Sequence, residues 1–193
     1  MSQSERSGRR VVVIGALVVL ALGALLGVVL RADTEPAGVE RARLAGFGEV
    51  AATITDASGE TCEVCLLAAV TPSQRDRGLM EVTDPTLGGY DGMVFVYDEP
   101  SSGSFWMRNT PMPLSIAFFD GEGQLISTSD MAPCADRGDC PLYPAAAPFS
   151  AALEVVKGGL GDVLVKPGST MVLGARACPL ANSVRPPGQT GSQ

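Results

Sequence analysis

The stretch LSIAFFDGEGQLISTS, residues 114–129, indicates the fold most directly. Its first half, Leu114–Asp120, is rich in the aromatic and branched residues that strands favour, and Gln124–Ser129 forms a second such run. Between them lies the triplet 121–123, whose two glycines supply the backbone conformations of a tight turn. The stretch therefore predicts a β-hairpin.

Further strand-like runs are separated by turn residues along the chain, a pattern typical of a barrel or a sandwich. They cover residues 50–55, 60–70, 92–97, 104–107, 151–156 and 170–173. A short helix is predicted after Thr71, because this threonine can cap it, Pro72 suits its first position and Gln74 completes a capping box. Gly78 can end this helix. We expect a mostly β (β-rich α+β) domain, compact and barrel-like, with one or two short helices.

A single N-terminal transmembrane helix is expected to precede this domain. Residues 11–30, VVVIGALVVLALGALLGVVL, carry no charge, and at about 1.5 Å per residue they span roughly 30 Å, the thickness of a bilayer core. Three arginines precede the run and one follows it directly. The positive-inside rule then places the N-terminus in the cytoplasm and the domain outside. The alternative is a signal peptide whose cleavage leaves a secreted domain.

The predicted organisation has five segments. Residues 1–10 form a cytoplasmic tail, 11–30 the membrane anchor and 31–48 a tether of mixed charge, proline and glycine. Residues 49–180 form the extracytoplasmic β domain, and the polar, proline-containing residues 181–193 form a disordered tail. The expected location is the cell membrane, crossed once.

The composition excludes several classes of function. The net charge of −7 argues against a nucleic-acid partner. The chain has no histidine, which excludes imidazole bases, Ser-His-Asp and Cys-His nucleophile pairs, and histidine ligands for a metal. We expect neither a metal nor a cofactor.

Five cysteines, Cys62, Cys65, Cys134, Cys140 and Cys178, follow the predicted anchor. In an oxidising compartment they are expected to form disulfides, and two bonds leave one odd thiol that the sequence does not identify. The bond predicted first is Cys134–Cys140, which closes a short loop flanked by prolines. Redox catalysis by the C-x-x-C pair, Cys62 and Cys65, is disfavoured because the pair lies in a predicted strand, where residues three apart face opposite sides. Zinc held by four cysteines is a further alternative.

Four segments of the sequence resemble one known family. They are TPSQRDRGLM (71–80), DGMVFV (91–96), FWMRNTPMPL (105–114), and the prolines and cysteines of 133–143 followed by Leu153-Glu154 and Gly158. In this order they are similar to the motifs of the DUF192 (UPF0127) family, over roughly residues 50–173. The resemblance implies a compact, mostly β, barrel-like and commonly exported domain, and it implies no established activity.

The chain departs from the family pattern at two places. Members usually have aspartate directly after the proline and leucine that end the third motif, but here the residue is Ser115. Cys62, Cys65 and Cys178 are not associated with the family pattern, and we interpret them as additions that stabilise the domain outside the cell.

The candidate ligand-binding residues are drawn from the third motif and its surroundings. Trp106, Met107, Arg108 and Asn109 combine an aromatic ring, a thioether, a guanidinium and an amide, a mixture that can line a pocket. The structural alternative is that Trp106 belongs to the core and Asn109 caps a turn.

Arg77 and Glu154 complete the candidate set, since they occupy family-like positions. Their structural alternative is an ion pair that braces the domain.

Three functions are compatible with these residues. The first is a non-catalytic module of the cell envelope that binds a small ligand or another envelope component. The second is an envelope enzyme that uses Arg77, Asn109 and Glu154 on a carbohydrate or cell-wall substrate. The third is redox or copper handling through cysteine and methionine, although methionine more often fills gaps in a core.

Overall fold

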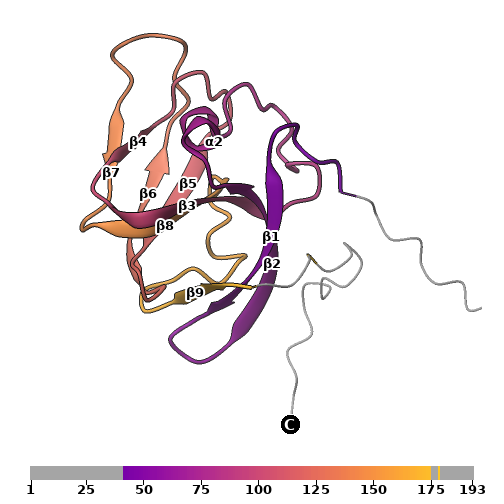
Figure 1. Cartoon of the computed structure of the whole chain (residues 1–193), viewed down its shortest axis with the longest axis vertical. Helices are drawn as coiled ribbons and strands as arrows, with labels where there is room; N and C mark the ends of the chain where they lie inside the picture. Colours follow the sequence, from indigo (N-terminus) through magenta and orange to yellow (C-terminus); the bar gives the residue numbers. More distant parts are fainter. Residues whose placement is uncertain (1–40, 175–177, 179–193) are drawn as a thin grey trace, which may run out of the picture. The chain divides into compact units, whose positions relative to one another are not determined.

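The computed structural model describes residues 41–174 and residue 178, and it is rich in β-strands (Figure 1). A seven-stranded sheet has the order β6-β5-β8-β3-β2-β1-β9, and β4 and β7 form a separate two-stranded sheet. The elements are β1 (Gly48–Thr55), β2 (Thr61–Ala69), α2 (Pro72–Arg77), β3 (Gly92–Ser101), β4 (Ser104–Trp106), β5 (Leu114–Phe119), β6 (Leu125–Met131), β7 (Leu142–Pro144), β8 (Phe149–Val156) and β9 (Thr170–Leu173). The prediction of a mostly β domain is confirmed, and the described residues contain one helix, α2.

The hairpin predicted at 114–129 is formed by β5 and β6, which pair antiparallel from Leu114 opposite Met131. Its turn is held by Asp120, whose carboxylate accepts hydrogen bonds from the backbone N–H groups of Glu122 at 3.0 Å and Gln124 at 2.7 Å. An aspartate side chain that bonds to the backbone two residues on is a common turn device. The local chemistry of the sequence is therefore sufficient to set this hairpin.

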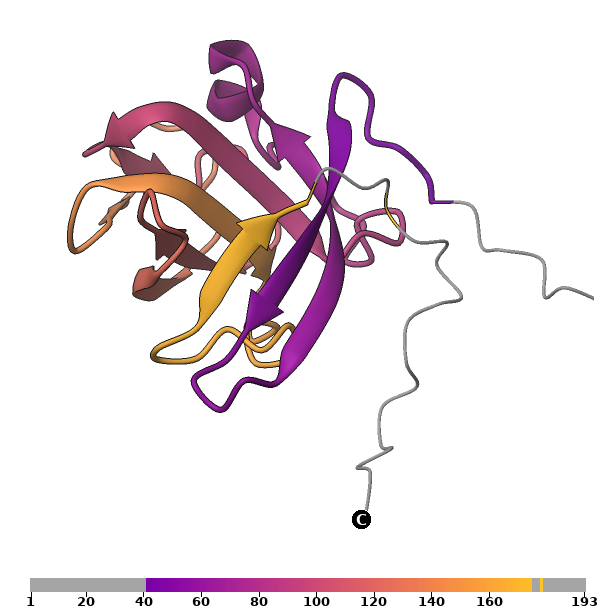
Figure 2. The ribbon, with the colours of Figure 1, turned by 60° about the horizontal axis from the view of Figure 1, so that its bottom comes forward.

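The sheet curls, but within the described residues it does not close into a barrel, so of the expected barrel-like domain the β-rich character is confirmed and a closed barrel is not present. Within the described residues, its two edge strands, β6 and β9, meet through a single bridge between Gln124 and Thr170. At this point the N–H of Met171 donates to the carbonyl of Gly123 at 2.8 Å, and a Cβ at Gly123, where φ is +78°, would lie 2.3 Å from the Met171 carbonyl oxygen. Because β9 is only four residues long and pairs with β1 (Figure 2), no continuous ladder joins the two edges.

Helix α2 begins as its sequence predicts. The Thr71 hydroxyl accepts a hydrogen bond from the Gln74 N–H, and the Gln74 side chain accepts one from the Thr71 N–H at 2.9 Å. The helix ends at Gly78, where φ is +47° and a Cβ would lie 3.1 Å from the Phe95 ring. Glycine therefore lets the end of α2 lie close to β3.

The central strands β5 and β8 are buried on both faces, and alternate residues of β5 enter different cores. On β5, Ile116 and Phe118 pack into one cluster, whereas Ala117 and Phe119 pack into the other. The first cluster contains the aromatic rings of Phe95, Phe118 and Phe149, with Phe105 packed against them, and is called the aromatic cluster below. This burial explains why LSIAFF is apolar at every position except Ser115, rather than alternating.

The predicted membrane anchor lies outside the described residues, as do the tail 1–10, most of the tether and the tail 181–193. No helix in the described part of the chain is long and apolar enough to cross a membrane. The described end of the expected tether contacts the domain, since the Ala42 N–H donates to the Gly88 carbonyl at 2.9 Å and Phe47 is buried.

Candidate functional site

A pocket of about 330 Å³ lies among α2, the residues that follow it, and strands β3, β4 and β8. It is called the Glu154 pocket below. Its walls include the aromatic residues Phe95, Tyr97, Phe105 and Trp106, and the polar and charged residues Arg75, Asp76, Arg77, Thr110 and Glu154. Its volume is at the lower end of the range for small-molecule sites.

Glu154 is the unusual residue of this pocket. It lies on β8 opposite Met93 of β3 and Ile116 of β5, and because strand side chains alternate, it faces away from the core that holds Leu153 and Val155. Its exposed fraction is 4%, and its carboxyl group has no hydrogen bond or ion pair with any described residue. Burial raises its pKa to about 8, so the carboxyl group is mainly protonated at neutral pH.

Tyr97 and Arg75 form the side of the pocket between β3 and α2. The Arg75 guanidinium lies 4.7 Å from the centroid of the Tyr97 ring and donates hydrogen bonds to the carbonyls of Val70 at 2.7 Å and Val96 at 2.8 Å. Burial raises the pKa of the Tyr97 hydroxyl; Arg75 opposes this shift and Glu154 adds to it. The Tyr97 hydroxyl has no hydrogen-bond partner among the described residues.

Arg77 also lines the pocket, but it does not form the ion pair with Glu154 that was the structural alternative. Its guanidinium donates to the Ala45 carbonyl at 2.8 Å and lies 5.2 Å from the centroid of the Phe47 ring. The ion-pair interpretation is wrong because the residues that precede β1 engage this side chain instead.

The motif from Trp106 to Thr110 is divided among several environments. Trp106 is 48% exposed at the pocket wall, so the interpretation that it belongs to the core is wrong. Met107 is fully buried in the aromatic cluster, and Arg108 forms an ion pair with Asp136 at 2.6 Å. Thr110 is buried and lines the Glu154 pocket.

Asn109 adopts a turn conformation, with φ of +55°, and its carbonyl accepts the Glu81 N–H at 2.8 Å. It lines a second, more open pocket of about 570 Å³ together with Pro111 and Asp136. Thr110 also lines this second pocket. Arg77 and Glu154 therefore line one pocket and Asn109 lines the other.

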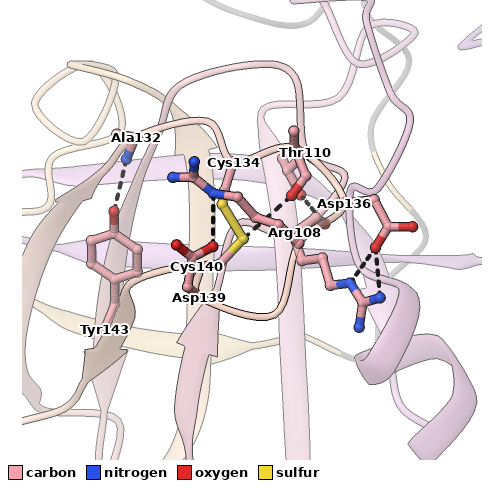
Figure 3. Close-up of a disulfide and its surroundings, with 10 residues drawn as sticks. Arg108, Thr110, Ala132, Cys134, Asp136, Asp139, Cys140 and Tyr143 are labelled. Atoms are coloured by element: carbon pink, nitrogen blue, oxygen red, sulfur yellow. Dashed lines mark hydrogen bonds and ion pairs between the residues drawn. A yellow bond between two sulfur atoms is a disulfide. The ribbon is translucent and has the colours of Figure 1, made fainter.

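The disulfide Cys134–Cys140 is present as predicted, and Cys134 contacts the backbone of the motif 106–110 (Figure 3). Cys134 makes β-bridges with Arg108 and Thr110, and its N–H donates to the Met107 carbonyl at 3.3 Å. The disulfide loop therefore supports the segment that contributes Trp106 and Thr110 to the pocket.

The second disulfide joins Cys65 to Cys178, which leaves Cys62 as the free thiol. Burial, with smaller effects from Asp91, Glu63 and Glu60, raises the pKa of the Cys62 thiol. Since Cys65 is already bonded to a distant partner, the C-x-x-C pair is not a dithiol. The structure also places Cys65, Cys178 and Glu49 near one another, but both sulfurs are used in the disulfide rather than free to bind a metal.

The methionines of the recognisable segments are mostly core residues. Met93 and Met107 are fully buried, and Met112 is 8% exposed, all within the aromatic cluster. This placement fits the gap-filling role of methionine.

Ser115, which occupies the position where the family usually has aspartate, lies on β5 opposite Asp130 of β6. Its hydroxyl donates to the Asp130 carboxylate at 2.6 Å and accepts the Gly158 N–H at 3.0 Å. The hydrogen bond from Ser115 is the main cause of the lowered pKa of Asp130. The carboxylate at this place is thus supplied by the neighbouring strand.

Three residues line the pocket without having been predicted as site residues: Arg75, Asp76 and Tyr97. Tyr97 lies two positions after Phe95 on one strand, so the two side chains share a face, and this spacing was the available signal. Arg75 lies in the first family-like motif, 71–80, but its place at the pocket, like that of Asp76, depends on how α2 packs.

Comparison with known proteins agrees with the fold. Residues 53–173 match the DUF192 family model, described as Uncharacterized ACR. A crystal structure from Novosphingobium aromaticivorans, of a protein of unknown function, is 30% identical with a TM-score of 0.59 and covers 75% of this chain and 98% of that chain. One from Sinorhizobium meliloti 1021, described as a candidate transcription regulator, is 25% identical with a TM-score of 0.58 and covers 68% and 98%. No curated protein matches the chain.

Proposed function

The chain belongs to the DUF192 family, and from this premise we propose that it is a membrane-anchored, extracytoplasmic domain that binds a small ligand in the Glu154 pocket. An envelope component that presents such a ligand is an equally suitable partner.

The observation that carries this proposal is the unpartnered carboxyl group of Glu154. Glu154 is 4% exposed on a central strand, and its carboxyl group has no hydrogen-bond partner among the described residues. Because no fully buried side-chain oxygen or nitrogen of the described residues lacks a partner, the Glu154 oxygens are open to the pocket that they line, where a ligand can hydrogen-bond to them. Perturbed carboxyl groups in pockets are typical of functional sites.

The proposed location is supported by the sequence and by the cysteines. Residues 11–30 have the length and apolarity of a membrane span, and the two disulfides suit an oxidising compartment. Membrane fractionation of cells that express the full chain should recover it in the pellet after carbonate washing. Recovery of a shortened chain in the soluble exported fraction would instead support cleavage.

Ligand binding can be tested by thermal shift on the full chain, produced by export into an oxidising host and screened against a small-molecule library. Compounds that raise Tm should do so for the wild type and for the matched control Glu122→Leu, which makes the same change as Glu154→Leu on an exposed turn. The same compounds should not raise the Tm of Glu154→Leu. If every stabilising compound acts equally on Glu154→Leu, or none stabilises the wild type, the proposal is wrong.

A further inference from the structure

We propose that the Glu154 pocket accepts a neutral sugar ring from a glycan of the cell envelope. This inference rests on the ligand-binding function proposed above and names its substrate class.

The aromatic walls suit the apolar face of a sugar ring. Trp106 presents a half-exposed indole at the pocket, and Phe105, which also lines it, packs edge-to-face on Phe95 with centroids 4.9 Å apart. A pyranose carries C–H groups on one face, and these are attracted to the electron-rich face of an aromatic ring.

The free hydrogen-bonding groups suit the hydroxyls of a sugar. The Glu154 carboxyl and the Tyr97 hydroxyl have no partners among the described residues, and both line the pocket. The Thr110 hydroxyl donates to the Arg108 carbonyl at 3.4 Å, which leaves its oxygen able to accept. A protonated carboxyl, a phenol and a hydroxyl each donate and accept, as sugar hydroxyls do.

The two arginines of the pocket are oriented by contacts with the protein itself. Arg75 donates to two backbone carbonyls and stacks on Tyr97, and Arg77 donates to a third carbonyl and stacks on Phe47. Asp76 adds a carboxylate to the same wall. Each guanidinium group is therefore held by the protein through one nitrogen and keeps further N–H groups, which can donate to the hydroxyls of a sugar or to a phosphate, so the titration below includes phosphate as the competing probe.

The size and the surroundings of the pocket favour one sugar ring of a longer glycan. About 330 Å³ is small for a ligand site, and Trp106 lies opposite Leu142 in the β4–β7 sheet, with exposed fractions of 48% and 62%. This exposed apolar pair continues outward from the pocket, so the next sugar of a glycan can pack on it.

Trp106 is the only tryptophan of the chain, so its fluorescence reports directly on the pocket. The full exported chain is titrated with cellotriose and with chitotriose, and in parallel with phenylacetate and inorganic phosphate as non-sugar probes. We expect a saturable change with at least one saccharide. The affinity should fall about tenfold or more in Glu154→Leu and roughly three- to tenfold in Tyr97→Phe, which loses one neutral hydrogen bond.

Two further variants control for folding and for ionisation. Glu122→Gln should bind as the wild type does. Glu154→Gln keeps a donor and an acceptor, so it should retain saccharide binding at pH 9, where the wild type, having lost its carboxyl proton, binds more weakly.

The outcomes separate the two proposals. Saccharide binding that depends on Glu154 and Tyr97 supports the inference. Binding of phenylacetate or phosphate that depends on Glu154, without saccharide binding, overturns the sugar class and leaves the proposed ligand-binding function intact. Saccharide binding unchanged by Glu154→Leu overturns the inference, because the sugar then lies elsewhere. No response to any probe, together with a library screen without hits, overturns both.

Discussion

The stability of the domain should fall as pH rises through neutrality, and Glu154 should be the cause. Its pKa is about 8 in the folded chain and close to 4.5 when exposed. Between these values the unfolded chain releases a proton that the folded chain keeps, so the free energy of unfolding decreases by about 1.4 kcal/mol per pH unit. The stabilising contribution is complete below pH 4.5 and is lost above pH 8. From pH 5 to pH 8 the expected loss is roughly 3 to 4 kcal/mol.

Among the described residues, the other groups with a shifted pKa do not titrate between pH 5 and pH 8. Asp56, Asp84 and Asp130 have lowered pKa values, so the stability they contribute is present above 3.8 and is lost only as pH falls further. The pKa of the Cys62 thiol is raised above 9.0, and those of two tyrosines above 10.0, so these groups matter only at higher pH.

Urea unfolding of the wild type and Glu154→Gln at pH 5, 6.5 and 8 measures the effect. With typical m-values, the wild-type midpoint should fall by about 1 to 3 M urea over this range. Glu154→Gln has no proton to release and should change little, and it should be the more stable of the two at pH 8. Parallel pH dependences in the two proteins would show that burial of Glu154 does not control its ionisation, and the reasoning would be refuted.

Three further predictions concern the cysteines and the β5–β6 pair. Loop-closure entropy predicts that the double variant Cys65→Ser/Cys178→Ser, whose bond spans 113 residues, loses about 5 kcal/mol of unfolding free energy. Cys134→Ser/Cys140→Ser, whose bond spans 6 residues, should lose about 2 kcal/mol. Urea unfolding measures both losses, and a larger loss for the shorter loop would contradict the prediction. Ser115→Ala should cost roughly 1 to 3 kcal/mol, because it removes the two hydrogen bonds that the buried Ser115 hydroxyl makes with Asp130 and with the Gly158 N–H, and it should raise the pKa of Asp130 measured by NMR titration. The exported, unreduced chain should contain one thiol that reacts with a thiol reagent after unfolding, and a count of three or five would contradict the disulfides.

Features of the fold that depend on a few neighbouring residues could be predicted from the sequence. The turn at 121–123 and the capping box of Thr71 and Gln74 are local hydrogen-bonding arrangements, and both are present. The incomplete closure of the sheet could not be predicted. It depends on where the short strand β9 reaches the residues that precede β6, and the bridged residues Gln124 and Thr170 are 46 positions apart along the chain. The odd cysteine was likewise undecided, because the pairing of Cys65 with Cys178 requires the folded chain.

The candidate site was predicted in part. Arg77, Trp106 and Glu154 line one pocket, but Asn109 turns into another and Met107 enters the core. The side chains of adjacent residues in an irregular segment point in different directions. The residues of the motif 106–110, which the sequence presents together, therefore lie in different environments of the folded domain. The chemistry of Glu154 was also unforeseen, because the sequence suggests a charge partner and only packing shows that Arg77 is engaged elsewhere.

The disulfides and the buried carboxyl group are connected through stability. Holding Glu154 in an apolar strand position lowers the stability of the domain above pH 5, when exposed glutamate would be ionised. The loop-closure contribution of Cys65–Cys178, about 5 kcal/mol, is of the same size as the full cost of this burial. The Cys134–Cys140 loop, in turn, holds the backbone of residues 107–110 at the pocket wall. If stability alone mattered, leucine at position 154 would suit this apolar site better than glutamate. A carboxyl group kept there, in a chain that two disulfides stabilise, is the combination expected when that group contacts a ligand.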